Sequence, residues 1–142
     1  MGWYATLMFR LDRVGTLKAL VEKWCPQNCT TEKAYETSLA ELLRQELPEG
    51  IKITPQHSQG RFRANLVIDD RLIVEIKYNL DSTDKYHRLV GQIITYKDWT
   101  GKVILILTGQ ADPDLKNELY SRLRKEGLID SVWDDKVIVI EK

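Results

Sequence analysis

The 142-residue sequence is poor in the features that identify several protein classes at once. It holds two cysteines, Cys25 and Cys29, and two histidines, too few ligands for a convincing zinc site, so we expect both cysteines to be plain thiols. Lysine plus arginine and aspartate plus glutamate total 21 each, so there is no global basic field to attract nucleic acid. A nucleic-acid partner would have to be held by a local patch.

Signals for membranes, secretion and several common enzymes are also missing. Arg10, Asp12 and Arg13 interrupt the first apolar stretch, so it does not resemble a signal peptide, and no run approaches the ~20 apolar residues of a membrane span. Gly-rich phosphate loops, nucleophile elbows and H-E-x-x-H motifs are not found. We therefore expect a cytoplasmic protein with no membrane partner, whose chemistry lies outside these motifs.

The periodicity of the apolar residues predicts an α/β protein. A tight turn at Asp69-Asp70 joins two alternating runs, and the continuous apolar run after Lys102 suits a strand that is covered on both faces and reached by a crossover. The expected fold is a mixed central sheet flanked by helices, with an antiparallel three-strand meander plus a parallel crossover strand. The expected helices cover about 6–24, 31–47, 84–99 and 113–126, and the expected strands cover about 51–57, 62–68, 72–78, 102–108 and 137–140.

The same pattern suggests how the chain is organised. We expect an amphipathic N-terminal helix within residues 1–26 that extends the core, followed by one domain over residues 27–142. The helix carries an apolar stripe that includes Leu7, Leu11 and Val21 and needs a cover. The simpler expectation is that the stripe packs on the protein's own sheet, and the alternative is a docking or dimerisation element in a possible homodimer.

Glu75 and Lys77 form the most informative pair in the sequence. They lie two residues apart on a predicted strand, so they project from the same side while Val74 and Ile76 point the other way. A carboxylate beside an ammonium on a rigid strand suits metal-assisted phosphodiester hydrolysis, in which one group holds a divalent cation and the other orients water or stabilises phosphate charge.

Two helices supply further candidates. Glu32 and Glu36 lie within or at the edge of the buried stripe of their helix, where an acid is costly unless it is paired or bound to metal. Gln92 lies four residues before Tyr96, so their side chains are neighbours that could hold a phosphate or a catalytic water. The alternatives are an edge acid paired with an arginine, and a glutamine and a tyrosine at a core boundary.

Basic residues near these candidates could form a local cationic rim for a sugar-phosphate backbone. A solvated helix face explains the helix charges as easily. The candidates for contact with substrate are Arg61, Arg63, Lys85, Arg88 and Tyr96.

From about Thr31 to Gly109 the chain resembles the PD-(D/E)xK phosphodiesterase superfamily, in particular its small RecB-like members with a restriction-endonuclease-like fold. The resemblance is carried, in this order along the chain, by Tyr35-Glu36-x-x-Leu39, Gln56, Arg63-Ala-Asn-Leu-Val-Ile, Val74-Glu75-Ile-Lys77 and Gln92-x-x-x-Tyr96. It implies a nuclease that uses Mg²⁺ or Mn²⁺ and acts on DNA more readily than on RNA, in repair or defence. By position, Glu36, Asn65 and Glu75 would bind the metal, Lys77 would position water, and Gln92 and Tyr96 would support the site or contact substrate.

Asn65 departs from the family pattern, in which close relatives have aspartate at this place. Asparagine keeps a carbonyl oxygen but loses the negative charge, so the affinity for Mg²⁺ should fall and the activation of bound water with it. The alternative hypothesis is a catalytically inactive, nuclease-derived module that binds nucleic acid or assembles with proteins.

Overall fold

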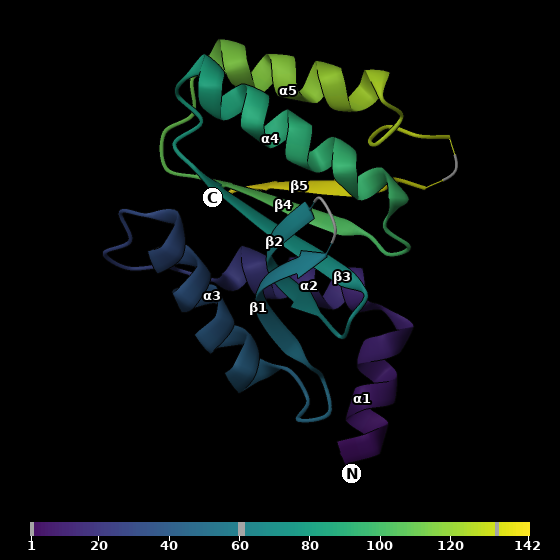
Figure 1. Cartoon of the computed structure of the whole chain (residues 1–142). Coiled ribbons are helices and arrows are strands. Elements are labelled where there is room, and N and C mark those ends of the chain that lie inside the picture. Colours follow the sequence, from purple (N-terminus) through teal and green to yellow (C-terminus); the bar gives the residue numbers. More distant parts are fainter. Residues whose placement is uncertain (1, 60–61, 133) are drawn as a thin grey trace.

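The computed structural model describes residues 2–59, 62–132 and 134–142. The chain folds into a five-stranded mixed sheet with helices on both faces (Figure 1). The strand order is β1-β2-β3-β4-β5; β1, β2 and β3 are antiparallel, and β4 and β5 continue parallel to β3. The predicted fold class is confirmed. The bounds are α1 Gly2–Leu11, α2 Arg13–Lys23, α3 Glu32–Glu46, β1 Ile53–Gln59, β2 Phe62–Ile68, β3 Leu72–Tyr78, α4 Thr83–Thr95, a short 3₁₀ helix Tyr96–Asp98, β4 Val103–Thr108, α5 Pro113–Lys125 and β5 Val137–Glu141.

Local chemistry accounts for the turns and helix starts that frame the sheet. Asp69 and Asp70 both adopt positive φ, 55° and 54°, which aspartate tolerates and which a two-residue hairpin turn requires. The Thr31 hydroxyl accepts a hydrogen bond from the Ala34 N–H at 3.0 Å and starts α3. The Ser82 side chain caps α4 in the same way.

The core consists of two apolar layers, one on each face of the sheet. α2 and α3 contribute Leu17, Val21, Leu39 and Leu43 to the layer that covers one face. α4 and α5 cover the other face, as Figure 1 shows above the sheet. All six residues of β4 are buried, as expected for a strand that is covered on both sides.

The N-terminal helix differs from the prediction. A single helix over 6–24 was expected, but the chain forms α1 and α2 with a break at Asp12. The Asp12 carboxylate accepts a hydrogen bond from the Gly15 N–H at 3.0 Å, which caps α2 and competes with continuation of α1. α2 packs into the core as expected, whereas α1 buries Phe9. Among the described residues, no helix combines the length and the apolar character needed to cross a membrane.

We predict that Asp12→Ala lowers the free energy of unfolding by about 1 kcal/mol, because the capping hydrogen bond to the first turn of α2 is lost. Chemical denaturation followed by circular dichroism measures this change. Asp12→Asn is the matched control, since its amide oxygen can still cap and stability should stay close to that of the wild type. An alanine variant with an unchanged denaturation midpoint would contradict the role of the cap.

Candidate functional site

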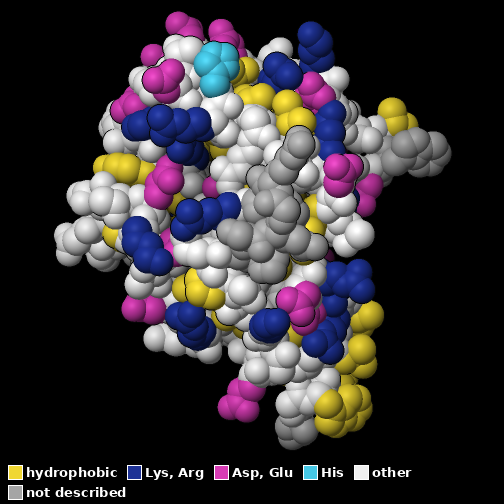
Figure 2. Space-filling view, viewed as in Figure 1, with side chains coloured by type: hydrophobic (Ala, Val, Ile, Leu, Met, Phe, Trp, Pro, Cys, Tyr) yellow, Lys and Arg dark blue, Asp and Glu magenta, His cyan; other side chains and the backbone are white. Residues whose placement is uncertain are grey.

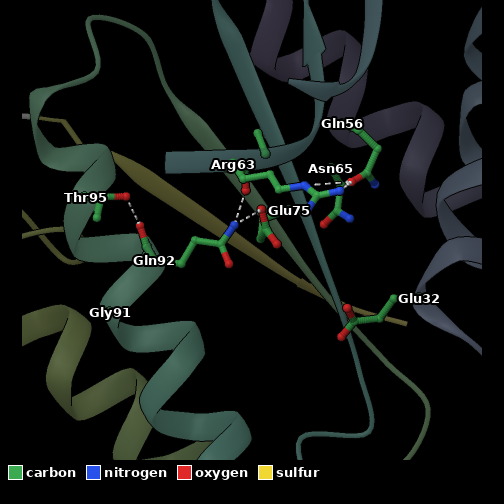
Figure 3. A pocket seen from close by; sticks show the side chains of 9 residues that line it. Glu32, Gln56, Arg63, Asn65, Glu75, Gly91, Gln92 and Thr95 are labelled. Atoms are coloured by element: carbon green, nitrogen blue, oxygen red, sulfur yellow. Dashed lines mark hydrogen bonds between the residues drawn. The ribbon is translucent and has the colours of Figure 1, made fainter. Parts of the chain in front are cut away.

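The site opens where β2 and β3 stop pairing. The two strands pair from Ile68–Leu72 to Leu66–Val74. At the next position, the side-chain oxygen of Asn65 accepts a hydrogen bond from the backbone N–H of Ile76 at 2.8 Å, so a side chain takes the place of a ladder carbonyl. A pocket of about 450 Å³ lies here, lined by Glu32, Gln56, Arg63, Ala64, Asn65, Glu75, Gly91, Gln92 and Thr95 (Figure 3).

Glu75 of β3 lines this pocket but is only 6% exposed. Its Oε2 atom accepts hydrogen bonds from the Tyr96 hydroxyl at 2.9 Å and from the Gln92 amide at 3.1 Å. Burial, together with the charge of Glu32, raises the pKa of Glu75 to about 7 against the opposing effects of Tyr96, a backbone hydrogen bond from Asn65 and the charge of Lys77. At neutral pH the carboxyl group is therefore divided between its protonated and ionised forms.

Gln92 and Tyr96 lie under Glu75 as one hydrogen-bonded unit. The Gln92 amide donates to the Tyr96 hydroxyl at 2.8 Å and to the backbone carbonyl of Arg63, and the Tyr96 hydroxyl oxygen lies 3.2 Å from the same carbonyl oxygen. Burial and the neighbouring carboxylate raise the pKa of Tyr96, so it remains a hydrogen-bond donor. This unit joins α4 to β2 and β3 at the point where the two strands diverge, which we call the β2–β3 fork. It fixes the position of the Glu75 carboxylate.

Glu36 of α3 is 1% exposed and lies behind the pocket wall. Its Oε1 atom accepts hydrogen bonds from the Asn65 amide nitrogen at 3.0 Å and from Gln56, and its Oε2 atom pairs with Lys33 at 2.9 Å. Gln56 and Asn65 lie opposite each other between the pairs Pro55–Leu66 and His57–Ala64 of β1 and β2. Donated hydrogen bonds therefore satisfy a buried carboxylate without the arginine partner considered above.

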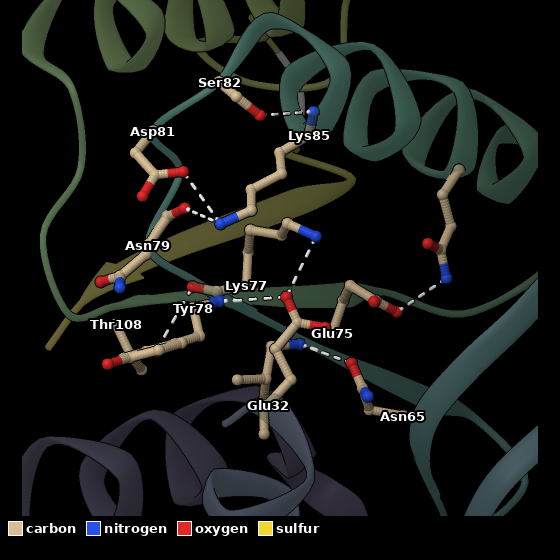
Figure 4. Close-up of polar contacts among 12 residues, drawn as sticks. Glu32, Asn65, Glu75, Lys77, Tyr78, Asn79, Asp81, Ser82, Lys85 and Thr108 are labelled. Carbon is tan, nitrogen blue, oxygen red and sulfur yellow. Dashed lines mark hydrogen bonds and ion pairs between the residues drawn. The ribbon is translucent and has the colours of Figure 1, made fainter. Parts of the chain in front are cut away.

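Lys77 does not point freely into the pocket, because Glu32 holds it. The ammonium of Lys77 and the Glu32 carboxylate are 3.0 Å apart, and the same carboxylate oxygen accepts the Tyr78 N–H at 3.2 Å (Figure 4). Glu32 lies one turn before Glu36 on α3, so its side chain contacts β3 beyond Val74, where β3 no longer pairs with β2. The Lys77 side chain is 16% exposed, so solvent reaches this ion pair.

Fewer basic residues lie at the pocket than the sequence analysis expected for the cationic rim. Arg63 is exposed and lines the pocket, where it donates two hydrogen bonds to the side-chain amide oxygen (Oε1) of Gln56 at 3.1 and 2.8 Å. Lys85 instead binds Asp81 and the Asn79 carbonyl, and Arg88 is exposed on α4; neither is part of the pocket lining over the described residues. Arg61 lies outside the described residues.

The oxygen atoms of the pocket suit a hard cation that needs only one or two ligands from the protein. Mg²⁺ is commonly held by one or two carboxylates together with water and phosphate oxygens, and Glu75 and Glu32 are two carboxylates that line one pocket. Their mutual repulsion, which raises the pKa of Glu75, is what a cation would relieve. Among the residues that the structure describes, no three His, Cys, Asp or Glu side chains form a cluster able to hold a metal ion.

No family model matches the chain, and no curated protein matches it significantly. A solved structure does match it, namely that of SfsA from Pyrococcus furiosus in complex with Ca²⁺. The sequence identity is 19% and the TM-score is 0.47; the match covers 77% of this chain and 54% of the other, so this chain spans about half the length of that protein. The likeness concerns the arrangement of the elements and carries no information on the activity of this chain.

Glu32 and Gln56 line the pocket, although the sequence analysis gave neither of them a role at the site. Helical spacing places Glu32 on the same face as Glu36, and that spacing was the available signal. For Gln56 the signal was its place in the resemblance to the nuclease superfamily. Its contact with Glu36 was not predicted, because no sequence pattern indicates the φ of 50° that Gln56 adopts inside β1.

We predict that Glu75 makes the metal-free protein less stable as the pH rises. Its folded pKa of about 7 exceeds the ordinary glutamate pKa of 4.5, so the folded state binds more protons between these pH values. The stability is retained below pH 4.5 and lost as the pH rises through 7. Glu75→Gln removes this loss, which is on the order of 3 kcal/mol at pH 8 and below about 1 kcal/mol at pH 5. Denaturation midpoints of both proteins, measured with chelator from pH 5 to 8, check the prediction; a constant difference would contradict it.

Proposed function

We propose that this protein is a metal-dependent phosphodiesterase that cleaves nucleic acid, DNA in preference to RNA, in the pocket at the β2–β3 fork. The supporting observation is the position of Glu75, a buried carboxyl group fixed by Tyr96 and Gln92 at the wall of an open pocket. Lys77 lies two residues along the same strand, as the sequence motif requires. These positions support the proposal, in which the groups that the resemblance to the PD-(D/E)xK superfamily implies act together at one site.

In this proposal Glu75 and Glu32 hold a single divalent cation, Mg²⁺ or Mn²⁺. Such an ion, when bound, supplies Lewis-acid stabilisation of phosphate charge and lowers the pKa of a coordinated water. Glu36 and Asn65, which the resemblance also implies as ligands, direct their contacting oxygens to hydrogen-bond donors in this structure. Their contribution as ligands remains a prediction.

The remaining residues bind and orient the substrate. Tyr96 and Gln92 hold the Glu75 carboxylate in one orientation, so little reorganisation is needed when substrate binds. Lys77 is paired with Glu32 and would donate to a phosphate oxygen or to the attacking water if that ion pair opened. Arg63, exposed at the pocket wall, neutralises a neighbouring phosphate of the backbone.

A second candidate function is a module that binds nucleic acid without cutting it. The observation that favours it is the hydrogen bond from the Asn65 amide nitrogen to Glu36. An aspartate at this place would keep one oxygen on the Ile76 N–H and turn the other towards Glu36, where only a cation or a proton could hold two carboxylates together. The asparagine amide brings no second negative charge and donates a hydrogen bond to Glu36, which reduces the need for a metal.

We predict that Asn65→Asp makes the folded protein dependent on divalent cations. The second carboxylate, about as close to Glu36 as the 3.0 Å hydrogen bond that it replaces, should lower the free energy of unfolding in chelator by roughly 1–3 kcal/mol. Mn²⁺ should raise the melting temperature of the variant more than that of the wild type, because ligand binding to the folded state stabilises it.

The matched control for this test is Glu36→Gln in the Asn65→Asp background, which removes the repulsion and should restore stability in chelator. An aspartate variant whose stability responds to neither chelator nor Mn²⁺ would contradict the proposed geometry. If the aspartate variant gains cleavage of DNA that the wild type lacks, the second candidate function describes the natural chain and the first describes its ancestry.

We predict that the wild-type protein cleaves DNA in Mg²⁺ or Mn²⁺ and that Glu75→Ala lowers the rate by at least about 100-fold, because a cation ligand is lost. The assay uses circular, linear, branched and single-stranded DNA, with RNA in parallel. Glu118→Ala, which alters an exposed glutamate of α5, is the control and should cleave at the wild-type rate. Cleavage that persists in Glu75→Ala would overturn the assignment.

A further inference from the structure

α1 presents a continuous apolar face to solvent. Its exposed side chains are Trp3, Tyr4, Leu7, Met8 and Leu11, each 47% to 73% exposed, and we call this set the α1 stripe. At about 100° per residue, the five positions fall within a single arc of about 140° on the helix. Hydrophobic side chains gather accordingly at the lower right of the molecule, where α1 lies (Figure 2). The scattered apolar surface of a typical protein has no such arrangement.

The rest of the chain holds α1 at few points. Phe9, on the opposite side of the helix from the stripe, is its buried residue, and Arg10 binds the Asp69 carboxylate at 2.9 and 3.0 Å. Isolated helices shorter than about 12 residues are marginal in water, and most helices in proteins are stabilised by packing of their apolar face. A ten-residue helix with its apolar face exposed therefore lacks the packing that would stabilise it.

Charge decides between the possible partners of this face. The α1 stripe carries no charged residue, and the nearby Arg10 and Arg13 share the Asp69 carboxylate. An anionic lipid surface would be attracted by unpaired cations, which α1 does not offer. The sequence as a whole has a formal net charge of zero, so two copies of the chain do not repel each other.

We propose that the α1 stripe is the surface through which two copies of this chain associate, with the two α1 helices antiparallel about a two-fold axis near Leu7. Leu7 lies midway between Trp3 and Leu11, so antiparallel pairing places the bulky aromatic end of one helix against the slimmer aliphatic end of the other. Residues at spacings of four form ridges that pack into the grooves of a second helix. A closed two-fold contact covers both stripes at once.

The exposed area limits the size of the interface. Two aromatic and three aliphatic side chains, 47% to 73% exposed, present roughly 500 Å² per copy, so the interface covers about 1,000 Å² in total, at the lower limit for specific complexes. Interfaces of this size are typical of weak complexes, so we expect dissociation in the micromolar range, with monomers at about 1 µM and dimers at about 100 µM.

Analytical ultracentrifugation over this concentration range, with chelator and without nucleic acid, tests the proposal independently of any catalysis. Leu7→Glu should keep the protein monomeric, since it places like charges at the two-fold axis, whereas Ala5→Glu on the same helix but outside the stripe should associate as the wild type does. A wild type that is monomeric at about 100 µM overturns the proposal. Equal association of the two glutamate variants overturns it as well.

Disulfide trapping tests the antiparallel arrangement. In a Cys25→Ser, Cys29→Ser background, Leu7→Cys should form a covalent dimer on mild oxidation, because a residue near the axis meets its own copy. Ala5→Cys is the control and should remain monomeric. Cross-linking at Ala5 but not at Leu7 overturns the arrangement, and a monomer that binds neutral or anionic vesicles through the stripe identifies a lipid surface in place of a second copy.

Discussion

The site depends on the hydrogen bonds that the Asn65 side chain makes. Its oxygen completes the ladder at Ile76 and its nitrogen donates to the buried Glu36, so one amide joins β2, β3 and α3 at the point where the sheet divides. Without Asn65 the Ile76 N–H would lose its acceptor, and Glu36 would keep only Gln56 and Lys33 as partners among the described residues. The fork can therefore open a pocket without a large loss of stability.

The two halves of the sheet contribute differently to this arrangement. β3 belongs both to the antiparallel meander and to the parallel part, so Glu75 is carried by a strand held firmly by the buried β4. α4 closes the other side through Gln92 and Tyr96, which contact the carboxylate and the backbone of Arg63. The site thus combines a strand paired on both sides with a solvent-exposed edge, where Arg63 and the ion pair of Lys77 meet solvent.

Sequence patterns predicted the elements better than the directions of their side chains. The Asp69-Asp70 turn and the alternating runs around it were predicted because local residue chemistry determines them. The break at Asp12 was missed because an aspartate caps a new helix only when the chain bends there, which depends on packing. The pairing of Lys77 with Glu32 could not be predicted, because it requires knowing that β2 leaves the edge of β3 at that point.

The charge state of Glu75 links cation and phosphate in this pocket. A phosphate beside Glu75 disfavours the ionised carboxylate, whose pKa of about 7 would rise further, whereas a cation favours that form and would lower the pKa. The single positive charge of Lys77 is already balanced in part by Glu32. A phosphate beside an ionised Glu75 therefore requires a further positive charge. A divalent cation would supply it, so binding of the cation and binding of the phosphate should reinforce each other.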